Sequence, residues 1–203
     1  MANLHNRAPQ THPRLILASA SPRRAELLRE HGYSFEVIPS PLPEPVAFSA
    51  ELSTIERAKA CSEFKANSVA RLAGDGWVLG ADTIASLDGR VFGKPADRRD
   101  AKQILQSLAG TTHQVITGVT LLDAASGNRL IRHDSTDVTM RRLTEREIED
   151  YLDTDAWQGK AGAYGIQDKG DAFVERISGS FTNVVGLPME LLDKMLSEFF
   201  PTK

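Results

Sequence analysis

Blocks of hydrophobic residues with two different periodicities alternate along the chain. Short apolar or alternating runs predict strands over residues 15–18, 33–38, 77–87, 90–92, 113–122, 129–140 and 173–177. Runs with helical spacing, bounded by capping and breaking residues, predict helices over residues 21–32, 53–72, 97–108, 144–153 and 188–199. Helices and strands therefore alternate throughout, which predicts an α/β fold.

Turn and cap residues separate these blocks. Ser21 and Pro22 favour the start of the first helix. Asp88-Gly89 predicts a tight hairpin, so the sheet is expected to be mixed rather than purely parallel. The prolines within residues 39–49 predict an extended loop, and the glycine-rich residues 158–170 predict irregular structure.

Composition argues against several classes of protein. The 203 residues include 24 Lys and Arg against 27 Asp and Glu, a net charge of −3, which argues against a broad nucleic-acid surface. No apolar run approaches the roughly 20 residues that cross a bilayer. Cys61 is the single cysteine, which excludes an internal disulfide and a cysteine-based zinc site. We expect Cys61 to be a packing residue in a reducing, cytoplasmic setting.

The first segment with candidate chemistry runs from Ala18 to Arg24. Small residues and hydroxyls end a strand there, and Arg23 and Arg24 stand in the first turn of the next helix. A helix N-terminus attracts anions and disfavours cations, so two arginines at this place point to a bound phosphate. The alternative is a solvent-exposed basic turn whose arginines pair with Glu26 or Glu30.

Two further candidates are single charged residues, one within the predicted strand over 77–87 and one after the hairpin that follows it. Asp82 lies between apolar residues of the predicted strand over 77–87, where a carboxylate suits a general base or a divalent metal. The alternative is a strand-end aspartate bonded to a turn. Lys94 follows across the predicted hairpin, and its charge suits a phosphate oxygen; an exposed turn lysine is the alternative.

The stretch Lys160-Ala161-Gly162-Ala163-Tyr164-Gly165-Ile166-Gln167 surrounds one aromatic with small residues, so that a ligand can approach its backbone. The Gln167 amide both donates and accepts hydrogen bonds, which is the chemistry needed to read a base edge. The alternative is a structural loop with Tyr164 in the core. We also expect His113 to be a hydrogen-bonded structural residue. Phosphate-binding groups at one end and an amide at the other indicate a nucleotide.

Taken in order, these segments resemble those of the Maf proteins, nucleoside triphosphate pyrophosphatases once discussed as inhibitors of septum formation. The resemblance extends from about Arg14 to Phe199 and rests on Leu17-Ala18-Ser19-Ala20-Ser21-Pro22-Arg23-Arg24, Gly80-Ala81-Asp82-Thr83, Gly93-Lys94-Pro95 and the stretch 160–167. It implies an elongated, twisted, mixed β-sheet flanked by helices, with two lobes and a central cleft, as in Maf and ITPase-like folds. We therefore expect a flexible leader, residues 1–13, and one Maf-like α/β domain, residues 14–203.

The resemblance also implies an activity. The family hydrolyses a nucleoside triphosphate to the monophosphate and pyrophosphate, with Mg²⁺ or Mn²⁺, in the cytoplasm. The stretch 160–167 is similar to that of the branch acting on dTTP and UTP. Two alternatives stay open, the branch acting on N7-methyl-GTP and a non-catalytic regulator of septum formation and cell division. The resemblance implies a homodimer, and neither nucleic acid nor a membrane is expected as a partner.

By the same resemblance, individual residues receive roles. Asp82 matches the family's proton acceptor, and the carboxylates that can hold the metal are Glu44 and Asp82. The positions for base selection are Arg23, Thr83 and Gln167. The positions on the phosphate side are Ser19, Arg24, Lys65 and Lys94. The arginines and lysines are expected to neutralise the triphosphate while Asp82 orients and deprotonates the attacking water.

Overall fold

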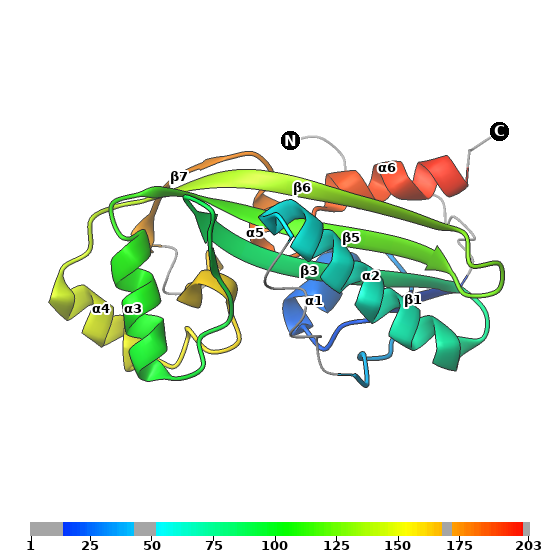
Figure 1. The fold of residues 1–203 in the computed structure, drawn as a ribbon, viewed down its shortest axis with the longest axis horizontal. Helices are drawn as coiled ribbons and strands as arrows, with labels where there is room; N and C mark the ends of the chain where they lie inside the picture. Colours follow the sequence, from blue (N-terminus) through cyan, green and yellow to red (C-terminus); the bar gives the residue numbers. More distant parts are fainter. Residues whose placement is uncertain (1–13, 43–51, 168–171, 201–203) are drawn as a thin grey trace.

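The computed structural model describes residues 14–42, 52–167 and 172–200, and Figure 1 shows their arrangement. In chain order the elements are β1 (Leu15–Leu17), α1 (Pro22–Glu30), β2 (Glu36–Val37), α2 (Thr54–Ala73), β3 (Trp77–Leu87), β4 (Arg90–Phe92), α3 (Arg98–Leu108), β5 (Thr112–Asp123), β6 (Arg129–Met140), α4 (Glu145–Leu152), η2 (Ala161–Ala163), β7 (Val174–Ser178), α5 (Phe181–Val185) and α6 (Met189–Phe199). The predicted α/β alternation is confirmed.

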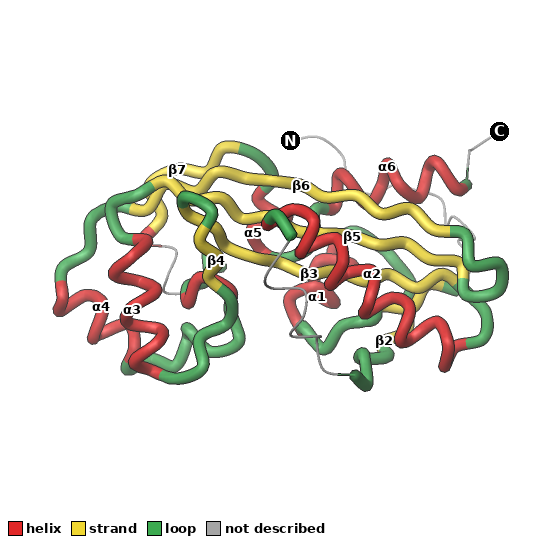
Figure 2. Tube along the Cα trace, viewed as in Figure 1, coloured by secondary structure: helices red, strands yellow, loops and turns green. Residues whose placement is uncertain are grey.

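Seven strands form one mixed sheet in the order β2-β1-β3-β5-β6-β7, with β4 also pairing on β3. β1 runs parallel to β2 and β3, and the other pairings are antiparallel. Figure 2 shows the long strands β3, β5 and β6 running along most of the molecule. α1, α2 and α6 flank one part of the sheet, while α3 and α4 gather at the other end. The elongated mixed sheet flanked by helices is therefore as expected.

Two glycines let α2 pack directly on this sheet. An ideal Cβ on Gly80 of β3 would lie 2.2 Å from the Ser62 carbonyl oxygen. One on Gly118 of β5 would lie 2.2 Å from the Ala58 carbonyl oxygen. Side chains do not tolerate such contacts with backbone atoms, so this close approach requires glycine at both positions. The face of α2 that carries Lys65 consequently lies against β3.

One edge of β3 is covered at both ends but not in the middle. β1 pairs with residues 77–79 and β4 with residues 85–87, and no described strand covers residues 80–84 on that edge. Successive side chains of a strand point to opposite faces. Ile84 packs with Ala58 of α2, whereas Ala85 belongs to the main core. Asp82 therefore faces α2 and Thr83 faces the other side, and both are reached through this gap.

Short elements account for the differences from the predicted pattern. The strand expected over 33–38 is reduced to Glu36–Val37, because Tyr33 and Phe35 pack against the main core instead of pairing. α5 and η2 were not predicted, since five and three residues are too few to show a helical period. Residues 1–13 of the expected leader and 43–49 of the expected loop lie outside the described residues. Within the described chain, no helix is both long and apolar enough to span a membrane.

Candidate active site

A cleft of about 770 Å³ opens at the uncovered stretch of β3. Its walls come from the β1–α1 connection and the first turn of α1, from α2 and β3, from Lys94 two residues after β4, and from residues 158–167 and 184–186. All the predicted site residues that the structure describes line it: Ser19, Arg23, Arg24, Lys65, Asp82, Thr83, Lys94 and Gln167. Glu44, the remaining predicted residue, lies outside the described residues.

Arg24 joins three parts of the cleft wall. Its Nε donates to the Gly186 carbonyl oxygen at 2.8 Å, Nη1 to Ser19 Oγ at 3.0 Å and Nη2 to Thr83 Oγ1 at 3.0 Å. Only 8% of Arg24 is exposed, so the alternative of a solvent-exposed basic turn is wrong for this residue. Ser21 occupies the expected N-cap position, but its side chain makes no capping bond; its N–H instead donates to Ser19 Oγ at 3.2 Å.

Arg23 takes a different place from its neighbour. It is partly exposed in the cleft wall, and its Nη2 reaches the Gly159 carbonyl oxygen at 3.4 Å. This contact connects the first turn of α1 to the opposite wall. Adjacent helical residues point about 100° apart, which explains why one arginine is buried in the fold and the other borders the opening.

Lys65 and Asp82 form an ion pair on the face of the sheet covered by α2. Lys65 Nζ lies 2.5 Å from Asp82 Oδ1, and 13% of each side chain is exposed. The approach of α2 at Gly80 brings the two groups together. The carboxylate is therefore oriented by a positive charge while still bordering the cleft.

Thr83 lies on the opposite face, within a hydrogen-bond network. Its Oγ1 accepts from Arg24, lies 3.0 Å from Thr117 Oγ1 and donates to the Gly186 carbonyl oxygen at 3.3 Å. Thr117 Oγ1 in turn donates to the Asn183 carbonyl oxygen at 3.2 Å. The Thr83 hydroxyl is thus held in place by neighbours from α1, β5 and the α5 region.

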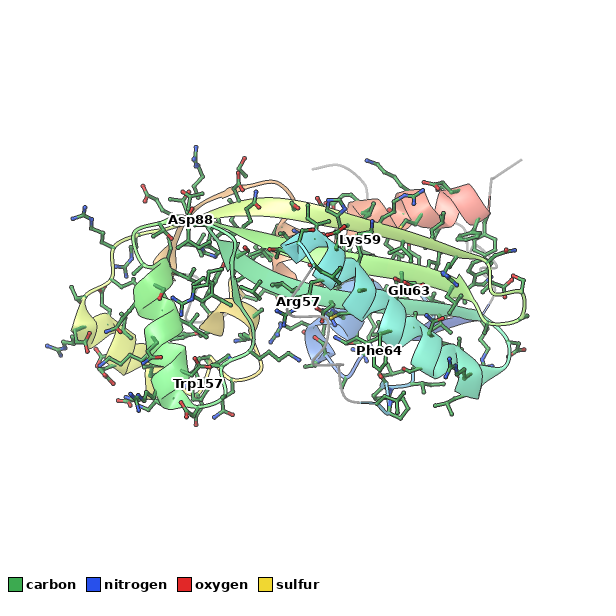
Figure 3. The ribbon with its side chains drawn as sticks, in the orientation of Figure 1. Arg57, Lys59, Glu63, Phe64, Asp88 and Trp157 are labelled. Atoms are coloured by element: carbon green, nitrogen blue, oxygen red, sulfur yellow. The ribbon has the colours of Figure 1, made fainter. Side chains whose placement is uncertain are left out.

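The wall opposite α1 is built by residues 158–167. Figure 3 places the preceding Trp157 in the lobe of α3 and α4, and its Nε1 donates to the Leu152 carbonyl oxygen at 3.1 Å. Lys160 is buried, with Nζ 2.5 Å from the Ala156 carbonyl oxygen, and Gln167 is exposed. Tyr164 lines the cleft and belongs to the core, which confirms the core position expected by the structural alternative, while the approach of a ligand to this loop stays a prediction.

His113 is a buried, hydrogen-bonded residue, as predicted. Its Nε2 lies 2.7 Å from Tyr164 Oη. Burial lowers the pKa of His113 from 6.5 to about 4 and raises the pKa of Tyr164. The imidazole is therefore neutral at physiological pH, and the pair is held together as two uncharged groups.

Cations dominate the described cleft lining. Its one carboxylate is that of Asp82. Its five cationic side chains are those of Arg23, Arg24, Lys65, Lys94 and Lys160. This local excess of positive charge contrasts with the −3 of the whole chain. A cleft with low-dielectric walls focuses such a field, so the arrangement suits a small polyanion.

The side chains of the cleft offer few ligands for a divalent metal. No group of three His, Cys, Asp or Glu side chains that could hold a metal occurs in the part of the chain that the structure describes. A cation such as Mg²⁺ needs fewer protein ligands than three, because it commonly binds one or two carboxylates together with substrate phosphates and water. Asp82 provides one such carboxylate, so the site fits a metal that arrives with a phosphorylated substrate.

Three contributors to the site were missed or given no role from the sequence: Lys160, Asn183 and Gly186. Lys160 belongs to the stretch 160–167 that the sequence singled out, but the pattern of that stretch did not predict that Lys160 is buried. Asn183 and Gly186 act through carbonyl oxygens, which no residue pattern reveals. The sequence signal for this region was the pair of residues that bound the short helix α5. Ser180 caps α5, and Gly186, with a φ of 131°, ends it.

The fold and the site define an α/β protein with a cationic cleft that suits a small polyanion. A family model described as Maf-like protein matches residues 14–199, and the chain belongs to this family. A dTTP/UTP pyrophosphatase of Bdellovibrio bacteriovorus is 44% identical, covering 92% of this chain and 99% of the relative. One of Pelotomaculum thermopropionicum is 42% identical, covering 91% and 96%. A solved HAM1 protein from Coxiella burnetii shares the fold, with a TM-score of 0.50 and 19% identity over 91% of this chain and 98% of its own.

Proposed function

We propose that the protein is a nucleoside triphosphate pyrophosphatase that hydrolyses dTTP and UTP to the monophosphate and pyrophosphate. The observation that carries the proposal is that five cations and one buried carboxylate share the described lining of a single cleft. A triphosphate needs its oxygens neutralised before water can attack phosphorus, and this lining supplies the charge. The relatives named dTTP/UTP pyrophosphatase, at 42–44% identity, favour the pyrimidine substrates.

The proposed reaction is a displacement at the α-phosphorus. Water forms the new oxygen–phosphorus bond, the bond from the α-phosphorus to the bridging oxygen breaks, and pyrophosphate leaves. Asp82 accepts the proton from the water, a contribution worth roughly 10²–10⁴-fold. Lys65 orients that carboxylate through the 2.5 Å ion pair. Arg24, Lys94 and Lys65 counter the charge of the phosphates.

A divalent cation belongs to the proposal. When bound, Mg²⁺ or Mn²⁺ supplies further charge neutralisation on the phosphate oxygens. Asp82 would hold it from the protein side, and Glu44 would do so by the family resemblance alone. The chain's own lysines and arginines bind and orient the phosphates in either case.

Base selection is assigned to Gln167, Thr83 and Arg23. Gln167 is exposed within the cleft lining and can donate and accept at a pyrimidine edge. Loss of a matched hydrogen bond to a substrate lowers discrimination by roughly 10-fold to 10³-fold. Gln167→Ala should therefore narrow the preference for dTTP over GTP. An unchanged preference would refute this role.

A panel of nucleotides tests the proposed function. The purified chain is incubated with Mg²⁺ or Mn²⁺ and dTTP, UTP, GTP, ATP or N7-methyl-GTP, and pyrophosphate is measured. We expect release from dTTP and UTP and loss of that release in Asp82→Asn, which keeps the shape but removes the base. Preference for N7-methyl-GTP would instead favour the other branch, and no release from any nucleotide would favour a non-catalytic regulator.

We further propose a cytoplasmic homodimer, as the family resemblance implies. Light scattering of the purified chain measures the state directly, and twice the mass of one chain is expected. A single-chain mass at micromolar concentration would contradict the dimer.

A further inference from the structure

The cleft wall opposite α1 has little regular structure to fix it. Within residues 158–167 the only helix or strand is the three-residue turn η2. The backbone φ is 74° at Gly162 and 60° at Ala163, a conformation that glycine adopts readily but that a residue with a Cβ, such as Ala163, disfavours. Contacts from outside the segment must therefore hold this backbone in place.

Tyr164 provides such a contact to the sheet. Its Oη lies 2.7 Å from Nε2 of His113, and the two rings meet edge to face with centroids 5.5 Å apart. His113 stands on β5, an interior strand, and is 1% exposed, while Tyr164 is 5% exposed. A buried hydrogen bond thus ties the sheet to the wall only three residues before Gln167.

Packing around Gly162 connects the Tyr164 ring to β3 and to Gly93, the residue after β4. The Gly162 N–H donates to the Gly93 carbonyl oxygen at 3.2 Å. An ideal Cβ on Gly162 would lie 3.0 Å from Tyr164 Cε1 and 3.3 Å from Ala85 Cβ. The turn is therefore confined between the tyrosine ring and β3, directly beside the residue that precedes Lys94.

The His113 side chain carries a penalty that an apolar residue would avoid. Its Nδ1 is buried and has no hydrogen-bond partner in the described part of the chain. Two apolar side chains of similar shape would fill this space without an unpaired polar atom. Stability alone thus does not account for an imidazole and a phenol here, whereas a directional bond that fixes the wall does.

We propose that His113 and Tyr164 are a positioning pair that sets where Gln167 meets the base, and so contributes to pyrimidine selectivity. The inference rests on the proposed function. Neither side chain contacts the α-phosphorus in this scheme. The pair acts through the backbone of residues 164–167, so its loss alters substrate binding more than the chemical step.

Tyr164→Phe tests the pair, because it keeps the ring and removes only the hydroxyl. The kcat and KM for dTTP and for GTP are measured by pyrophosphate release. We expect the KM for dTTP to rise about five- to tenfold, while kcat falls less than about threefold. The ratio of kcat/KM for dTTP over GTP should fall about tenfold.

Tyr151→Phe is the matched control. Tyr151 is a second buried tyrosine, on α4, with its ring 4.9 Å from that of Phe173, and it does not line the cleft. Its replacement should keep the KM and the selectivity of the unmodified chain. Urea unfolding of both variants separates loss of stability from loss of selectivity.

Two substitutions at His113 complete the test. His113→Gln keeps a group that can hydrogen-bond to the phenol, whereas His113→Leu does not, so His113→Gln should retain more of the selectivity. Unchanged KM and selectivity in Tyr164→Phe would overturn this inference but not the proposed function. Equal losses of selectivity in the two His113 variants would do the same. Absence of pyrophosphate release by the unmodified chain would overturn the proposed function and this inference with it.

Discussion

Replacing Gly80 by alanine tests whether the closeness of α2 to β3 is what brings Lys65 to Asp82. The new methyl group would lie 2.2 Å from the Ser62 carbonyl oxygen and 2.9 Å from the Ala66 amide nitrogen. Both are backbone atoms, so no side-chain rotation relieves the overlap. Ordinary contact begins at 3.4 Å, so α2 must withdraw by about 1.2 Å, the difference between 3.4 and 2.2 Å.

The same withdrawal separates the ion pair. Lys65 lies between Ser62 and Ala66 on α2, and its Nζ is 2.5 Å from Asp82 Oδ1. A shift of 1.2 Å along that direction takes the distance to about 3.7 Å, beyond hydrogen-bonding range. Overpacking of this kind destabilises by roughly 1–3 kcal/mol, and a misplacement of about 1 Å lowers turnover by up to roughly 10²-fold.

Urea unfolding and the rate of pyrophosphate release from dTTP measure the two effects. Gly93→Ala is the control, because an ideal Cβ at Gly93 meets no atom within 4 Å and its φ lies outside the left-handed region. Its unfolding free energy should stay within about 0.5 kcal/mol of the unmodified value. If Gly80→Ala kept both stability and turnover, the proposed coupling of helix approach to the ion pair would be wrong.

Three further predictions concern charge. Burial lowers the pKa of His113 from 6.5 to about 4, so the stability it contributes is present above pH 6.5 and is lost as pH falls toward 4. The unfolding free energy should drop by about 2 kcal/mol between pH 7 and pH 5, and a urea series on His113→Gln should show a flatter profile. Arg24→Lys keeps one charge but cannot bridge Ser19, Thr83 and the α5 end together, so steady-state assays should show kcat/KM at least about 10²-fold lower; near-normal kcat/KM would contradict the bridging role. Lys94→Met should raise the KM for dTTP about tenfold with little change in kcat, and an unchanged KM would remove it from the phosphate side.

Local signals predicted the long elements of the fold. The strand over 77–87 and the hairpin after it follow from alternation and from Asp88-Gly89, whose φ values of 50° and 81° fit the tight turn. The strand expected over 33–38 is reduced to Glu36–Val37 because tertiary packing of its first residues outweighed its alternation. Tyr33 binds Asp193 of α6 through its hydroxyl, so the side chain is held against the core rather than in the sheet.

The candidate site was predictable as a set of residue types but not as a geometry. Arg23 and Arg24 are adjacent in the sequence, yet only Arg24 becomes a buried bridge, because that depends on partners 59 and 162 residues away. The face on which Asp82 lies depends on α2, whose approach is set by Gly80. Backbone carbonyl acceptors such as that of Gly186 are indicated in the sequence only indirectly, by the cap and the glycine that bound α5.

Hydrolysis of dTTP in ¹⁸O-labelled water tests the central claim most directly. Attack at the α-phosphorus, beside Asp82, places the label in dTMP and leaves the released pyrophosphate unlabelled. Mass spectrometry of the two products distinguishes this from attack at the β-phosphorus. We predict one ¹⁸O in dTMP and none in pyrophosphate, with the reaction lost in Asp82→Asn. Label in the pyrophosphate would contradict attack at the α-phosphorus, and release of inorganic phosphate and dTDP instead would contradict the proposed function.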